Sequence, residues 1–406
     1  MRSIFMKTNV VPPDGTLNEE TAVSDPDEFQ TSQVFTVAGG HFVHDTYSAF
    51  LAPLLPLIQE RLATGYALTG SLAIFAQLPS LLNPFLGYLA DKVSLRYFII
   101  LAPGITATLF SSLGLVPNYL TLALLLVAAG VSIAAFHAPA PAMVARVSGN
   151  RVGKGMSIFM AAGELGRTLG PVVAVAGVSW FGLEGIWRLA FVGWGVSVIL
   201  YFRLRTISAR PKTAVSGNLA ALWPQMRRLF SVIIWLVGAR VFLQASITTY
   251  LPIFVKDALG LSLWLSAASL TILEAAGVVG ALFTGTFSDK LGRNRMLLIL
   301  LSISPILHLL FVFGPTWMAV PLLIGLGLTA ISPQPVMLAL VQDSFPDHRA
   351  LANGVYLAVS FLVRALGIWV VGMLADRLGL QNAFLWSGLL AFLSIPAIFF
   401  LPKKSE

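Results

Sequence analysis

Twelve long apolar segments set the strongest limit on what this chain can fold into. Each approaches the ~20 apolar residues that a helix needs to cross a bilayer. Only 11% of the 406 residues are charged, against about 25% in a typical soluble domain. The chain therefore has too few charged side chains to cover the surface of a soluble protein of this size. The pattern predicts an all-α integral membrane protein with twelve transmembrane helices. The segments are 34–59, 68–90, 97–116, 119–145, 155–178, 186–204, 228–254, 263–287, 296–314, 317–342, 351–375 and 380–401.

The Lys and Arg residues between these segments favour one orientation in the membrane. With the N-terminus in the cytoplasm, 19 of them fall in cytoplasmic segments, and four face the opposite side, namely Arg61, Arg188, Lys256 and Arg377. Basic loops are retained on the cytoplasmic side. Both termini are therefore predicted to be cytoplasmic, in a multi-pass protein of the cell membrane, most simply a bacterial inner membrane. The net charge of +8 reflects these loops, and no nucleic-acid partner is expected.

The two halves of the chain repeat each other. Gly87–Lys92 returns as Gly285–Lys290, 198 positions later, and Arg167–Gly170 returns as Arg364–Gly367, 197 positions later. Such duplication predicts two pseudo-symmetric six-helix bundles, which suit alternating access around a site near the midplane. The predicted organisation is a disordered acidic cytoplasmic tail at 1–33, an N-terminal bundle at 34–204, a cytoplasmic linker at 205–227, a C-terminal bundle at 228–401 and a cytoplasmic tail at 402–406.

Three motifs resemble those of the major facilitator superfamily. The signature between the second and third helices occurs in two copies, as Gly87, Asp91, Lys92 and Arg96 and again as Gly285, Asp289, Lys290 and Arg293. A motif in the fifth segment resembles the signature of the drug/proton antiporter branch and consists of Gly163, Gly166, Gly170 and Pro171. His41-x-x-x-Asp45 and Phe136-His137 look like the fosmidomycin-resistance family of exporters.

The resemblance implies a major facilitator fold and a gating role for the two loop motifs. It also implies proton-driven efflux of a phosphonate-like or other anionic solute. Small residues at this spacing let helices approach closely, so the glycines of the fifth segment are expected to serve helix packing.

A few ionisable residues lie inside the apolar segments, where each costs about 2.5–3.5 kcal/mol on insertion scales. Asp45 lies near the middle of the first segment and His41 lies one helical turn before it, so both project from one face. We expect Asp45 to carry the coupling proton, with His41 tuning it. The alternative is an Asp45 permanently paired with an arginine or hydrogen-bonded to hydroxyls. His137 either lines a cavity or packs between helices.

The other intramembrane charges predict an anion site. Arg167 and its repeat mate Arg364 are expected to flank a central cavity and clamp a phosphonate, phosphate or carboxylate, with Arg240 as a third donor. Glu164 and Arg167 are three residues apart, so they could instead form a purely structural pair within one helix. Glu274 is expected to hold whichever arginine lacks substrate.

Together these features predict a proton-coupled secondary active transporter, an efflux antiporter for a small organic solute or drug that works by alternating access. The alternative is a proton-coupled uptake symporter for an organic acid, amino acid or sugar. A membrane-embedded enzyme or a receptor is less favoured, because the chain holds no Walker, His-Glu-x-x-His or Gly-x-Ser-x-Gly motif. No cofactor or metal is expected, the proton gradient being the energy source. The expected partners are a small-molecule substrate, protons and the lipid bilayer around a monomer.

Overall fold

The computed structural model describes residues 28–401 apart from 84, 87–88, 90–92, 209–218 and 346–348. Throughout this described part the chain is helical and contains no β-strand. The α-helices of its N-terminal half are α1 (Thr31–Ser48), α2 (Leu51–Leu62), α3 (Tyr66–Gln77), α5 (Arg96–Ser111), α6 (Tyr119–His137), α7 (Ala140–Val147), α8 (Val152–Gly185) and α9 (Ala190–Leu204).

The described C-terminal half mixes α-helices with π-helical turns at Ser246–Tyr250, Phe254–Ala258 and Gly327–Ile331. Such turns interrupt the regular helical ladder and are frequent at functional sites. The α-helices of this half are α10 (Leu219–Ala245), α11 (Leu251–Ile253), α12 (Leu263–Leu291), α13 (Arg293–Phe313), α14 (Ala319–Leu326), α15 (Pro333–Ser344), α16 (Arg349–Leu378), α17 (Leu380–Ala391) and α18 (Ser394–Ile398).

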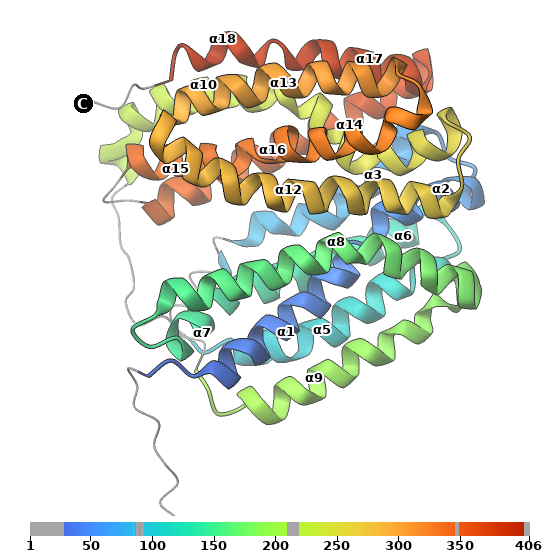
Figure 1. The fold of residues 1–406 in the computed structure, drawn as a ribbon. Helices are drawn as coiled ribbons and strands as arrows, with labels where there is room; N and C mark the ends of the chain where they lie inside the picture. Colours follow the sequence, from blue (N-terminus) through green and yellow to red (C-terminus); the bar gives the residue numbers. More distant parts are fainter. Residues whose placement is uncertain are drawn as a thin grey trace, which may run out of the picture.

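The two halves form two stacked groups of helices. In Figure 1, α1, α5, α8 and α9 lie in the lower group, and α10, α13, α17 and α18 lie in the upper group. Within the described residues, nine helical segments are long and apolar enough to cross a membrane, and one of them, Lys154–Leu204, holds the two predicted spans 155–178 and 186–204. The first predicted span, 34–59, corresponds to α1 and α2, and the second, 68–90, overlaps the shorter apolar helical segment Tyr66–Leu82. The predicted all-α membrane fold is confirmed.

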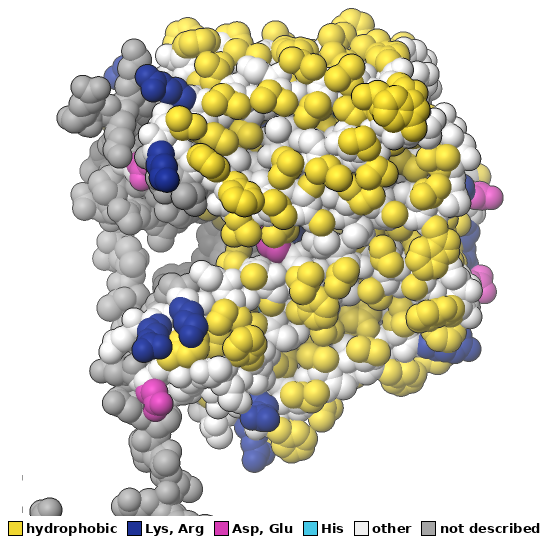
Figure 2. Space-filling view, in the orientation of Figure 1, with side chains coloured by type: hydrophobic (Ala, Val, Ile, Leu, Met, Phe, Trp, Pro, Cys, Tyr) yellow, Lys and Arg dark blue, Asp and Glu magenta, His cyan; other side chains and the backbone are white. Residues whose placement is uncertain are grey.

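The outer surface of both groups is apolar. Figure 2 shows hydrophobic side chains spread over the sides of the molecule, with Lys and Arg gathered toward its ends. Large apolar side chains are strongly exposed there, for example Trp180 at 74%, Leu282 at 71% and Phe399 at 70%. A soluble monomer rarely exposes so wide an apolar surface, so this face is the one that contacts lipid.

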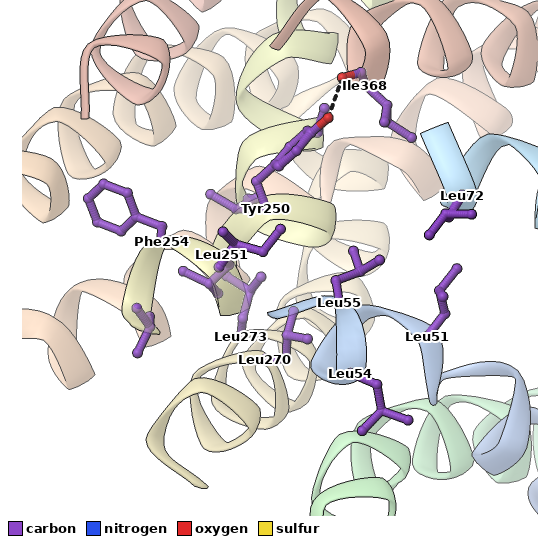
Figure 3. Packing of buried hydrophobic residues seen from close by; sticks show 14 of the residues in the cluster. Leu51, Leu54, Leu55, Leu72, Tyr250, Leu251, Phe254, Leu270, Leu273 and Ile368 are labelled. Carbon is purple, nitrogen blue, oxygen red and sulfur yellow. Dashed lines mark hydrogen bonds between the residues drawn. The ribbon is translucent and has the colours of Figure 1, made fainter. Parts of the chain in front are cut away.

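The bundles are joined at one end of the molecule. There, Leu51, Leu54, Leu55 and Leu72 of the N-terminal half share one buried cluster with C-terminal residues that include Tyr250 (Figure 3). The Tyr250 hydroxyl donates a 2.8 Å hydrogen bond to the Ile368 carbonyl, which fixes the centre of this cluster. We call this the Asp376 end, after an acid of α16 described below.

The opposite end, where α9 ends at Leu204 and α10 begins at Leu219, is called the linker end. Its two buried clusters each draw on one half alone. One packs Val37 and Ile99 around Leu204, and the other packs Met226 around Tyr356. The described side chains therefore join the bundles at the Asp376 end and pack them separately at the linker end.

Helices α1 and α8 pack at backbone distance because of glycine. A Cβ atom added at Gly166 would overlap the Phe42 carbonyl oxygen, and one at Gly170 would lie 2.5 Å from the Thr46 carbonyl oxygen. At Gly163 it would overlap the His41 ring. Pro171 follows directly and is buried in α8. The small residues thus set the distance between two helices that carry charged side chains.

We expect Gly166→Ala to destabilise the protein by roughly 1–3 kcal/mol, the usual cost of overpacking. The new methyl group would meet a backbone carbonyl, which cannot rotate away, so α1 and α8 would have to separate. The measurement is the thermal unfolding midpoint of the purified protein in detergent. Gly39→Ala on α1 is the matched control, because its Cβ would meet nothing within 4 Å. Equal midpoints for the two variants would contradict the close-packing interpretation.

Candidate functional site

The charged centre of the N-terminal bundle is built around Asp45. This carboxylate is 1% exposed and belongs to α1. Its Oδ2 lies 3.0 Å from Nη1 of Arg167 and 3.3 Å from Nε2 of His41. Its Oδ1 lies 3.4 Å from Nε2 of His137. Arg167 also forms an ion pair with Glu164. We call these five residues the Asp45 cluster.

Three helices bring the cluster together. His41 and Asp45 lie four residues apart on α1, and Glu164 and Arg167 lie three apart on α8, so each pair shares a helix face. His137 is the last residue of α6, just before the Ala138–Pro139 turn that separates α6 from α7. The sequence predicted both intrahelical pairs, but it could not show that α6 and α8 deliver His137 and Arg167 to the same carboxylate.

Three residues of the Asp45 cluster are also possible ligands for a metal ion. Donor atoms of His41, Asp45 and His137 all lie within 4.8 Å of one another, which is close enough for a shared cation. However, the guanidinium of Arg167 already contacts the Asp45 carboxylate. A second multivalent positive charge beside it would be repelled across a few ångströms of low dielectric. The donor set therefore suits a proton better than a divalent metal.

A cavity of about 190 Å³ lies between the two bundles. We call it the central cavity, and its lining comes from both halves: Ser48, Ala49, Leu51, Ala52, Ala73, Ala76, Gln77, Phe110, Ile133, Thr248, Thr249 and Arg364. Arg364 supplies its positive charge. One Nη2 hydrogen bond joins Arg364 to the Thr248 hydroxyl at 3.2 Å, whereas its buried Nε has no hydrogen-bond partner within the described part of the chain. No described carboxylate lies within 4.0 Å of Arg364, so its positive charge favours an anion in the cavity that it lines.

The other two charges of the C-terminal bundle take different places. Arg240 of α10 is 5% exposed and donates a 2.8 Å hydrogen bond to the Ala330 carbonyl. It lines a separate small void beside Gln244, so it does not join Arg364 in the central cavity. Glu274 of α12 makes no ion pair within 4.0 Å among the described residues, and the charges that act on it are those of Arg167, Glu164 and Arg364. Arg240, predicted as a third donor beside Arg167 and Arg364, therefore lies away from the central cavity, whereas charges of both bundles act on Glu274.

The two loop motifs are only partly described. Gly87, Asp91 and Lys92 lie outside the described residues. Arg96 begins α5 and lies over the Tyr97 ring at 5.5 Å. In the second copy, Gly285, Asp289 and Lys290 belong to α12, where Lys290 is exposed and the side chain of Asp289 is outside the description. Arg293 forms a 3.2 Å ion pair with Asp343 of its own half and also donates to Ser288. The predicted gating role stays a prediction.

Sequence reasoning missed the polar contacts that join the bundles at the Asp376 end. The Asp376 carboxylate of α16 accepts hydrogen bonds from the backbone N–H groups of Tyr66, at 2.5 Å, and Ala67, at 3.0 Å. These are orphan donors at the start of α3, whose own N-cap residue, Gly65, has no side chain to satisfy them. A carboxylate at this position also gains from the helix dipole. In the sequence, the one sign of this contact is Gly65, an N-cap residue without a side chain, which leaves the first N–H groups of α3 in need of an acceptor.

A second contact across the same end joins Lys256 to Glu60 at 2.8 Å. The hydrogen bond from Lys256 lowers the pKa of Glu60 below its ordinary value of 4.5. A lowered pKa means that the carboxylate is bound most tightly when ionised. The contact is therefore complete above about pH 4.5 and is lost as the pH falls through the lowered pKa.

We expect Asp376→Asn to loosen the Asp376 end by roughly 1–2 kcal/mol, the usual value of a charged helix cap, which is about five- to thirtyfold in the open population. The chain has no native cysteine, so a single Leu251→Cys in the joined cluster can report opening by its rate of maleimide labelling. Glu184→Gln is the control, because Glu184 pairs with Arg61 at 3.3 Å within one bundle. Equal labelling rates in the two backgrounds would show that the cap does not hold the bundles together.

Comparisons with known proteins agree with this architecture. The family model of the Major Facilitator Superfamily matches residues 37–368. The chain is 24% identical to the fosmidomycin resistance protein of Escherichia coli (strain K12), over 88% of this chain and 90% of that protein. It is also 30% identical, over 47% of this chain and 49% of that protein, to an MFS-type efflux pump of Mycolicibacterium smegmatis.

Among solved structures, the chain is similar to a bacterial homologue of the human lysosomal transporter Spinster in an inward-facing, unoccupied conformation. The TM-score is 0.72 at 16% identity, covering 92% of this chain and 95% of that one. This likeness concerns the fold, and together with the family model it confirms the major facilitator fold that the motif resemblance implied. The chain therefore belongs to the Major Facilitator Superfamily, and it is a multi-pass membrane transporter rather than an enzyme.

Proposed function

We propose that this protein is a proton-coupled exporter of small organic anions that works as an antiporter by alternating access. The observation that carries the proposal is the division of charge between the bundles. Proton-binding side chains gather in the Asp45 cluster of the N-terminal bundle, and Arg364 of the C-terminal bundle brings a positive charge to the lining of the central cavity. Export is supported by the likeness of the chain to the fosmidomycin resistance protein of Escherichia coli.

The formal charges of the two bundles are complementary. Asp45 and Glu164 outnumber Arg167 by one negative charge in the N-terminal bundle, and Arg364 and Arg240 outnumber Glu274 by one positive charge in the C-terminal bundle. A proton neutralises the first excess and a monoanion neutralises the second. Burying an uncompensated charge is costly, so the N-terminal bundle offers a site for a proton and the C-terminal bundle offers a site for a monoanion.

Antiport requires that the anion and the proton cross in separate steps, so that the protein changes conformation with one of them bound at a time. We propose that the anion is loaded at Arg364 while the bundles are apart at the linker end. The excess of Lys and Arg in the loops at that end supports placing it in the cytoplasm, with both termini, in a bacterial inner membrane. The proton would enter from the Asp376 side after the bundles exchange contacts, and it would leave at the linker end.

One observation favours a second candidate, an uptake symporter. Arg167 contacts Asp45 while its side chain is 41% exposed. A proton in the cluster would weaken the hold of Asp45 on Arg167, which could then reach an anion in the cavity. Proton and anion would bind cooperatively in that case, and they would travel in the same direction.

The experiment compares a strain that overexpresses the protein with an empty-vector strain against fosmidomycin, with and without an uncoupler. Resistance that disappears with the uncoupler supports proton-driven export, whereas greater sensitivity on overexpression supports uptake. A thermal-shift series of the purified protein with phosphonate, zwitterionic and lipophilic cationic solutes tests the charge preference. Stabilisation by cations alone would defeat the proposal of an anion carrier.

A further inference from the structure

The hydrogen bonds of the two cluster histidines fix where their protons lie. Nδ1 of His41 lies 2.8 Å from the Phe159 carbonyl oxygen, and Nδ1 of His137 lies 3.0 Å from the Ile133 carbonyl oxygen. A carbonyl oxygen only accepts, so both Nδ1 atoms must carry hydrogen. In a neutral ring of this tautomer, Nε2 holds a lone pair and has no hydrogen to donate.

Both Nε2 atoms nevertheless face acceptors. They lie 3.3 Å from each other, at hydrogen-bond geometry. Each also lies 3.3–3.4 Å from an oxygen of Asp45. Without an additional proton, two ring lone pairs and a carboxylate would face one another in a buried site. The arrangement is favourable only when a proton occupies it.

We propose that the coupling proton is held between Nε2 of His41 and Nε2 of His137, with Asp45 remaining ionised as its counter-ion. The inference rests on the proposed function and locates its proton. Binding forms one Nε2–H bond with a proton delivered by water, and release breaks the same bond. Oδ1 of Asp45 has no hydrogen bond among the described residues and lies 3.4 Å from Nε2 of His137, so the carboxylate offers a free acceptor beside the ring that carries the proton.

Every charged group around the pair is consistent with this placement. On α8, Arg167 contacts Asp45 and favours its ionised form, while Glu164 balances Arg167. On α12, Glu274 interacts with Arg167 rather than with the rings. On α1, His44 is fully buried and stacks on Phe136, and neither of its nitrogens is hydrogen-bonded within the described chain. A charged His44 would lack a partner, so the proton belongs to the other two rings.

The two rings differ in their freedom. The His41 side chain is 3% exposed, stacks on Phe159 with a centroid distance of 4.0 Å and lies against Gly163. The His137 side chain is 35% exposed and ends α6 at a turn. Proton exchange with water therefore occurs through His137, whereas His41 is the fixed partner.

The test uses the full chain labelled with ¹⁵N-histidine in lipid nanodiscs. The ring signals of the five histidines are assigned by single substitutions. The number of protons that each sample takes up is then measured as the pH is lowered from alkaline to acidic values. We expect both rings to keep Nδ1–H at every pH and to share one proton at Nε2. His137→Asn should lower the uptake by one proton per protein. His308→Asn, which removes a buried histidine of the C-terminal bundle, should keep that proton.

The inference is overturned if either ring is an Nε2–H tautomer in the neutral form, or if His137→Asn leaves proton uptake unchanged. It is also overturned if micromolar Zn²⁺ shifts both ring signals, because the cluster would then be a metal site. The spectra of the wild-type chain decide the tautomers even if a variant fails to fold. Transport does not enter these readouts, so an intact shared proton in a protein that moves no fosmidomycin would refute the proposed function alone.

Discussion

Asp45→Asn is expected to abolish proton-driven transport while leaving substrate exchange across the membrane intact. The substitution removes the counter-ion of Arg167 and of the proton held by His41 and His137. Breaking a buried ion pair costs about 3–5 kcal/mol, which is more than a hundredfold in a binding equilibrium. The N-terminal bundle would therefore no longer bind the coupling proton at neutral pH.

The measurement is fosmidomycin transport in proteoliposomes, with and without an imposed pH gradient. Counterflow needs no net proton movement and should stay within about threefold of the wild-type rate, whereas gradient-driven accumulation should fall more than a hundredfold. Asp45→Glu keeps a carboxylate and is expected to retain part of the coupling. Glu184→Gln removes an exposed acid and controls for a general effect of charge. Full gradient-driven accumulation by Asp45→Asn would exclude Asp45 from proton coupling.

Arg364→Gln is expected to weaken anion binding by about 30- to 900-fold, or ~2–4 kcal/mol, the usual loss when one partner of a buried charged hydrogen bond is removed. Arg364 brings the positive charge to the central cavity, and its Nε has no competing acceptor among the described residues. The neutral amide would keep some hydrogen bonding but would lose both the charge and the fork of donors.

Binding of fosmidomycin to purified protein, measured by calorimetry, checks this expectation. Arg377→Gln is the matched control, because Arg377 lies on the same helix but is exposed at its last turn. Arg240→Gln tests Arg240 as a third donor and is expected to change the affinity much less, since Arg240 does not line the central cavity. Equal affinities of Arg364→Gln and Arg377→Gln would remove Arg364 from the site.

The sequence predicted the fold well because its strongest constraints are local. Twenty apolar residues in a row have one stable solution in lipid, and a repeated motif such as Arg167–Gly170 and Arg364–Gly367 indicates a duplicated bundle. Helix periodicity likewise predicted that His41 meets Asp45 and that Glu164 meets Arg167. Each of these contacts spans a single helical turn.

The rest of the site depends on which helices become neighbours. The repeat suggested that Arg167 and Arg364 play equal roles. Among the described residues, however, Arg167 contacts two carboxylates, whereas Arg364 hydrogen-bonds a threonine hydroxyl. The asymmetry arises because Asp45 has no acidic counterpart facing Arg364 within 4.0 Å in the described part of the chain. The cap that Asp376 supplies to α3 joins residues 310 positions apart, and no spacing rule reaches that far.

The central claim is that anion and proton movements are coupled in opposite directions, and proton flux during fosmidomycin transport tests it most directly. Proteoliposomes with a trapped pH indicator are loaded with fosmidomycin and diluted into medium without it. We predict that its outward flow drives protons inward, acidifying the lumen, and that Asp45→Asn removes this signal. Luminal alkalinisation, which means that protons leave with the anion, or fosmidomycin efflux without any proton movement, would contradict the account.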